Sequence, residues 1–136
     1  MVEELKNIIV QEAEALEQLL CELEYQHKCI VKNDFLGLEE CVDKIKNCNI
    51  NIAEYEMERR KITNGRPMSV IIEEIGDSET ERYYRNITRM LTELKTQKET
   101  NELLIKQGLV FSTKMLNIFS PGYRNNKTYN SYGKIR

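Results

Sequence analysis

The chain has 136 residues, which suits one domain, and its 20 basic and 22 acidic side chains nearly cancel to a net charge of -2. With 31% charged residues and a mean hydropathy of -0.56, the composition is typical of a soluble protein. Six glycines and two prolines are too few for a β-sandwich or barrel, which turns about every 8–12 residues. No apolar run reaches the roughly 18 residues of a membrane span, and the first residues do not resemble a secretory signal.

The first predicted helix covers residues 2–32. Its interior contains neither glycine nor proline, and large apolar residues recur at every seventh position: Val2, Ile9, Leu16, Leu23 and Ile30. This spacing predicts one apolar stripe along the helix. At about 1.5 Å per residue the helix is expected to be roughly 45 Å long.

The second predicted helix covers residues 34–62. Asn33 or Asp34 is a suitable N-cap for it, and Gly37 weakens the helix prediction locally. Apolar residues again recur with helical spacing: Phe35, Leu38, Cys41, Val42, Ile45, Cys48, Ile52 and Tyr55. Because only a few residues separate the two helices, we expect them to form an antiparallel hairpin.

A short helix over residues 67–75 is predicted next. The segment Asn64-Gly65-Arg66-Pro67 breaks the preceding pattern, and Pro67 is well suited to be the first residue of a helix. Ser78 and Glu81 then match a capping box, in which a serine side chain caps the helix and a glutamate three residues later returns the hydrogen bond. The sequence therefore predicts the next helix to start at Ser78.

This last helix is predicted to run over residues 78–119. If it is continuous through the polar stretch 95–102, its length of about 60 Å exceeds that of the hairpin by about 15–20 Å. Its C-terminal apolar residues are then expected to project beyond the other helices as an exposed surface. A break within residues 95–102, folding the end back onto the bundle, is the alternative.

The C-terminal third of the chain is basic. Residues 103–136 contain six Lys or Arg and no Asp or Glu. Residues 121–136 are too polar to form a core and are predicted to be a flexible basic tail. The fold expected from the whole sequence is all-α: an elongated antiparallel three-helix bundle or coiled coil of residues 1–120, with a short extra helix between helices two and three, followed by this tail.

The sequence shows no catalytic, metal or cofactor site. Its one histidine, His27, is expected to be a structural or surface residue, and no phosphate-binding glycine motif is present. Cys21, Cys29, Cys41 and Cys48 form no C-x-x-C pair, and we interpret them as small apolar core residues. We therefore expect a protein that is not an enzyme and needs no cofactor.

Three segments resemble the FlgN family of flagellar type III export chaperones. Lys32-Asn33-Asp34-x-x-x-Leu38 resembles the hairpin between the first two helices of that family, and Glu56-x-x-Arg59 resembles the end of its second helix. The third and most specific segment is Asn101-x-x-Leu104, leading through Gly108-Leu109-Val110-Phe111 to Met115-Leu116, with Tyr129-Asn130-Ser131-Tyr132-Gly133 near the terminus.

The resemblance implies a cytoplasmic chaperone that binds the C-terminal segments of hook–filament junction (hook-associated) proteins and delivers them to the flagellar export gate. No nucleic acid, stable membrane insertion or metal is implied. The candidate client-binding residues are Leu104, Ile105, Leu109, Phe111, Met115, Ile118 and Phe119. Tyr129 is the first candidate for docking to the export gate, and Tyr123 is the second.

Two other interpretations remain open from the sequence. The seven-residue repeat of the first helix is compatible with a homo-oligomeric coiled-coil scaffold or adaptor without a secretion role, although Glu12 and Gln26 interrupt its inner positions. The exposed C-terminal part of the third helix is also compatible with self-association. A regulator that contacts nucleic acid through the basic tail is disfavoured, since its few cations would give weak, salt-sensitive binding.

Overall fold

The computed structural model describes the backbone of residues 2–119 and the side chains of residues 2–109, 116 and 117. Four helices follow one another along the chain: α1 (Val2–Lys32), α2 (Phe35–Thr63), α3 (Met68–Ile75) and α4 (Ser78–Phe119). The predicted all-α bundle is confirmed. The chain divides into two compact units, Met1–Asn101 and Glu102–Arg136. The predicted division at residue 120 stays a prediction, because residues 120–136 lie outside the described residues.

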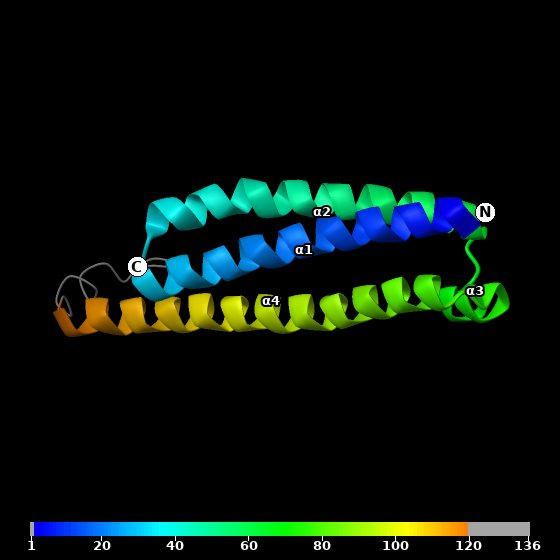
Figure 1. The fold of residues 1–136 in the computed structure, drawn as a ribbon. Coiled ribbons are helices and arrows are strands. Elements are labelled where there is room, and N and C mark those ends of the chain that lie inside the picture. The colour runs from blue at the N-terminus through cyan, green and yellow to red at the C-terminus, as the bar shows by residue number, and fades with distance from the viewer. Residues whose placement is uncertain (1, 120–136) are drawn as a thin grey trace. The chain divides into compact units, whose positions relative to one another are not determined.

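The first unit is a bundle of α1, α2, α3 and the part of α4 that ends at Asn101 (Figure 1). α1 and α2 form the predicted antiparallel hairpin. α4 runs alongside α1 in the same direction, because Lys6 contacts Asp77 at its start and the Leu23 carbonyl accepts a hydrogen bond from Asn101. The buried core combines residues of three helices: Leu5, Ile8, Ile9, Leu16, Leu23, Met68, Ile71, Ile87, Met90 and Leu94.

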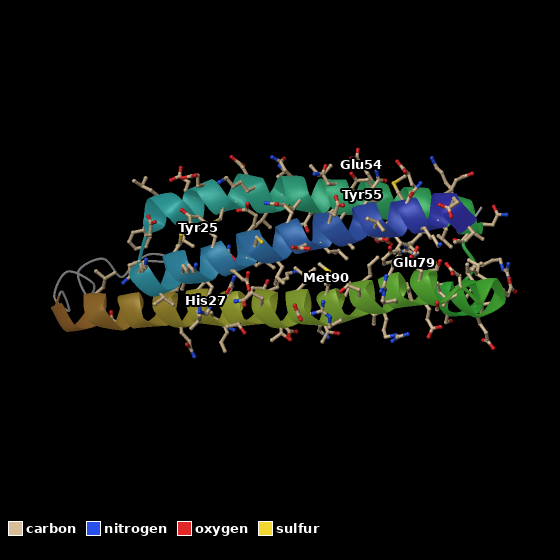
Figure 2. All side chains as sticks on the ribbon, viewed as in Figure 1. Tyr25, His27, Glu54, Tyr55, Glu79 and Met90 are labelled. Carbon is tan, nitrogen blue, oxygen red and sulfur yellow. The ribbon has the colours of Figure 1, made fainter. Side chains whose placement is uncertain are left out.

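The heptad pattern of α1 produces this core. Ile9, Leu16 and Leu23 are all buried, as their seven-residue spacing predicts. α2 covers this core cluster with partly buried residues, among them Ile45 and Ile52, and it also contributes the buried Cys41 and Cys48. Figure 2 shows Met90 between α1 and α4, where its side chain belongs to the core.

The turn between α1 and α2 explains why a glycine lies inside a helix. Asn33 adopts a left-handed conformation with φ 56°, and Asp34 caps α2 by accepting a hydrogen bond from the Gly37 amide at 3.0 Å. A Cβ atom at position 37 would lie 2.5 Å from the Cys29 sulfur and 2.6 Å from an Asp34 oxygen. Gly37 is therefore required by a close approach of the two helices, which more than offsets its low helix propensity.

Three local predictions need correction. The N-cap of α4 is Asp77, and Ser78 is the first helical residue, since Asp77 accepts hydrogen bonds from the Thr80 amide at 3.3 Å and the Thr80 hydroxyl at 2.7 Å. Pro67 is the N-cap residue of α3, which begins one residue later at Met68. Cys21 is exposed, whereas the other three cysteines are buried as predicted.

The break predicted as an alternative within residues 95–102 does not occur, because α4 is a single helix from Ser78 to Phe119. Its polar residues do not interrupt the backbone hydrogen bonds, since each of them is compatible with a helix. The predicted projection of the α4 end beyond the hairpin concerns the placement of the second unit and stays a prediction.

We expect Asp77→Ala to lower the melting temperature by about 5 °C through loss of the α4 cap. Hydrogen bonds from Thr80 and from Lys6 lower the pKa of Asp77 from 3.8 to about 2. A carboxylate with a lowered folded-state pKa stabilises the fold above its unfolded-state pKa, and this stabilisation disappears as the pH falls from about 4 to about 2.

Thermal unfolding followed by circular dichroism between pH 7 and pH 2 tests this prediction. The variant should lose stability at pH 7 and show a weaker acid dependence than the wild type below pH 4. Glu81→Ala is the control, because Glu81 pairs only with exposed Arg85 in the first turns of the same helix. Equal acid profiles for wild type and Asp77→Ala would refute the assignment of the cap.

Candidate client-binding site

The second unit contains the residues that the sequence predicts to bind a client. All seven lie in α4. Among those with described side chains, Leu104 is half-buried, Ile105 is 38% exposed and Leu109 is 65% exposed. The side chains of Phe111, Met115, Ile118 and Phe119 lie outside the described residues, as do Tyr123 and Tyr129.

Among the described side chains of this unit, two further apolar residues are exposed and were not among the predicted site residues. Leu103 is 55% exposed and Leu116 is 59% exposed. Leu116 follows Leu109 by seven residues, so the two share one face of the helix. That spacing is visible in the sequence and would have been enough to include Leu116. The segment from Leu103 to Phe119 also contains Lys106 and Lys114 but no carboxylate.

A buried polar network lies where the first unit ends. The Asn101 side chain is only 1% exposed, and its amide nitrogen donates to the Leu23 carbonyl at 2.8 Å and to the Gln26 side chain at 2.9 Å. Its amide oxygen accepts from Gln97 at 2.9 Å and lies 3.3 Å from Nδ1 of His27. Figure 2 shows His27 between α1 and α4. The network fixes the position of α4 along α1 at this point.

The sequence identifies residues 95–102 as a polar stretch, and this network was not predicted from it. The signal was present in the spacing, because Gln97 and Asn101 continue the inner positions of Met90 and Leu94 by steps of three and four. Polar residues at inner positions of a helix bundle are typical of a register-defining contact. His27 is a structural residue in this network.

A second polar contact joins α1 to α2. The Glu12 carboxylate accepts a hydrogen bond from Nε of Arg59 at 2.8 Å and lies 3.5 Å from Nη2 of the same guanidinium. The Glu12 side chain is 6% exposed and that of Arg59 is 19% exposed. The residues that interrupt the apolar stripe of α1 are thus matched by partners: Arg59 pairs with Glu12, and Asn101 pairs with Gln26.

A cavity of about 350 Å³ opens beside this ion pair, at the junction of α2, α3 and α4. Arg59, Arg60 and Arg66 line it. Each guanidinium has a carboxylate partner, namely Glu12, Glu56 and Glu74 respectively. The positive charge of the cavity wall is therefore balanced, and the cavity has no marked preference for an anion.

The described part of the chain contains neither a cluster of metal ligands nor a helix that could span a membrane. No group of three or more His, Cys, Asp or Glu side chains there is arranged to hold a metal ion. Among residues 2–119, no helix combines the length and the hydropathy that crossing a bilayer requires.

The chain matches a known protein family along its whole length. Neither the curated proteins nor the solved structures gave a match. A family model described as FlgN protein matches residues 1–136, which is the whole chain. Two residues of the segments that carry the resemblance have structural roles in the helical bundle. Asp34 is the N-cap of α2 in the hairpin, and the buried Asn101 donates a hydrogen bond from α4 to α1. The chain therefore belongs to the FlgN family, a family of flagellar export chaperones.

Proposed function

We propose that this protein is a cytoplasmic export chaperone that binds the C-terminal segments of hook–filament junction proteins and delivers them to the flagellar export gate. Membership of the FlgN family supports the chaperone role. The observation that carries the client site is the exposure of large apolar side chains on the C-terminal part of α4. Leu103, Leu109 and Leu116 are each more than half exposed.

An amphipathic client helix fits this surface chemically. Apolar residues at helical spacing can accept the apolar face of a second helix, with anchors at i, i+3, i+4 and i+7. Because the segment from Leu103 to Phe119 carries Lys106 and Lys114 and no carboxylate, a client with acidic flanking residues is favoured. Complementary charge of this kind mainly increases the association rate and the selectivity.

The proposed binding is strong enough to hold a client and weak enough to release it. Burial of a few hundred Å² of apolar surface contributes several kcal/mol at about 25 cal/mol per Å². Ordering a disordered client segment offsets part of this gain. For delivery, Tyr129 and then Tyr123 remain our candidates for the contact with the export gate.

The test is to titrate the full-length chain with a C-terminal peptide of a hook–filament junction protein and to measure the binding affinity by isothermal titration calorimetry. We expect the double variant Phe111→Glu and Met115→Glu to weaken binding at least about 100-fold, because two apolar anchors are replaced by charges. Leu91→Glu is the matched control, since Leu91 is an exposed apolar residue of the same helix outside the proposed site. Unchanged affinity of the double variant would exclude this site.

A further inference from the structure

The cavity at the junction of α2, α3 and α4 is not used by the proposed function. Its volume of about 350 Å³ lies within the roughly 300–1,000 Å³ that is typical of ligand sites. The turn between α2 and α3 forms part of its wall through Gly65, which is exposed and has a φ of 74°. No atom lies within 4 Å of the place that a Cβ atom at Gly65 would occupy. The cavity can therefore admit a small group from solvent beside this turn.

The three guanidinium groups of the cavity wall differ in exposure. The Arg59 side chain is 19% exposed, whereas those of Arg60 and Arg66 are 67% and 48% exposed. Arg60 and Arg66 each bond to their glutamate partner through Nη2. Because a guanidinium has five N–H donors, both residues keep donors that can bond to a ligand at the mouth of the cavity.

The ion pairs decide which kind of ligand the cavity favours. Since a carboxylate balances each guanidinium, an anion gains little from the positive charge. A paired guanidinium still has planar faces, and these faces stack well on aromatic rings. The remaining wall suits a ring too, because Tyr84 is a half-buried aromatic residue and Met68 supplies a thioether that packs well against aromatic groups. The lining therefore favours a neutral aromatic group.

The exposed donors of Arg60 and Arg66 favour a polypeptide as the source of this aromatic group. Every residue of a polypeptide carries a backbone carbonyl that accepts hydrogen bonds. A chain that places an aromatic side chain in the cavity therefore brings carbonyl acceptors to the mouth, where the two arginines are exposed. A free aromatic molecule without such acceptors would leave these donors to water.

We propose that this cavity binds an aromatic side chain of a partner polypeptide, with the ring among the guanidinium groups and Tyr84 and the flanking carbonyls bonded to Arg60 and Arg66. The site lies in the first unit, contains none of the client-binding residues of α4 and does not depend on the proposed function. One anchor in a small pocket binds weakly by itself, so we expect a millimolar dissociation constant for an isolated tryptophan amide.

An NMR titration of the isotope-labelled full-length chain with N-acetyl-tryptophanamide tests the proposal. We expect saturable shifts of the backbone amide resonances of Thr63, Gly65 and Met68, which line the cavity. N-acetyl-leucinamide has the same backbone but an aliphatic side chain, and it should bind at least about 5-fold more weakly. An acetylated and amidated Gly-Gly-Trp-Gly-Gly peptide should bind at least as tightly as the tryptophan amide, because its additional carbonyls can reach Arg60 and Arg66.

Arginine-to-lysine variants separate stacking from charge. The double variant Arg60→Lys and Arg66→Lys keeps both positive charges but loses two planar guanidinium groups. It should bind the tryptophan amide at least about 5-fold more weakly than the wild type. Arg85→Lys is the matched control, because Arg85 is also an exposed arginine paired with a glutamate but does not line the cavity. The melting temperature of each variant shows whether it is folded.

Several outcomes would overturn the proposal. The first three are no saturable shift with the tryptophan amide, equal affinity for the leucine amide, and wild-type affinity of the double lysine variant. Binding of the tryptophan amide without binding of the pentapeptide would show that the cavity takes a small aromatic molecule, and the assignment to a polypeptide would be wrong. Shifts confined to residues 102–119 would exclude the cavity and leave the client site on α4 unaffected by this result.

Discussion

Replacing Asn101 with leucine is expected to lower the free energy of unfolding by about 3 kcal/mol. The Asn101 side chain is almost fully buried; it donates hydrogen bonds to the Leu23 carbonyl and the Gln26 side chain and accepts one from Gln97. Leucine is close to asparagine in size but provides no partner for these groups. The cost therefore comes from polar groups left unpaired in the interior rather than from a cavity.

Urea unfolding followed by circular dichroism measures this effect. Asn51→Leu is the matched control, because Asn51 is an exposed asparagine in the middle of α2 and its replacement should change stability by less than about 0.5 kcal/mol. If the two variants have the same stability, the Asn101 network does not hold α4 against α1.

Glu12→Ala is expected to lower the free energy of unfolding by about 3 kcal/mol, because it leaves the largely buried guanidinium of Arg59 without its carboxylate. The double variant Glu12→Leu and Arg59→Leu should recover most of this loss. A buried ion pair gains little over well-packed apolar residues, whereas removal of one partner leaves an uncompensated charge.

The neighbouring ion pair between Arg60 and Glu56 provides the comparison. Its side chains are exposed, so Glu56→Ala should cost less than about 1 kcal/mol in the same urea experiment. A double variant that is less stable than Glu12→Ala alone would contradict this interpretation, since it would mean that the ion pair itself supplies the stability.

Periodicity predicted the helices because most of their inner positions are apolar. It did not predict the contacts that fix one helix against another, since Glu12 and Asn101 are polar residues at inner positions and their partners lie far away in the sequence. Hydrophobic pattern alone cannot identify such pairs. The sequence could not decide between Ser78 and Asp77 as the N-cap of α4, because both residue types cap helices well. Asp77 also contacts Lys6 of α1, and that contact between distant residues is not visible in the sequence.

The exposed apolar residues of α2 could have been recognised from the sequence, because Phe35 and Val42 are seven residues apart and so are Ile50 and Met57. Periodicity alone placed Phe35 and Val42 in one stripe with Cys41 and Cys48, since all are apolar and only burial separates them. For the client site, the sequence predicted the segment but not the full set of exposed residues. Leu103 and Leu116 were identified by their exposure in the structure.

The most direct test of the client site is amide hydrogen exchange of the full-length chain, followed in α2 and in residues 101–136, with and without a C-terminal peptide of a hook–filament junction protein. We predict that the peptide slows exchange in residues 102–119 and leaves exchange in α2 unchanged. If the peptide binds while exchange in residues 102–119 stays the same, the client does not bind to the C-terminal part of α4.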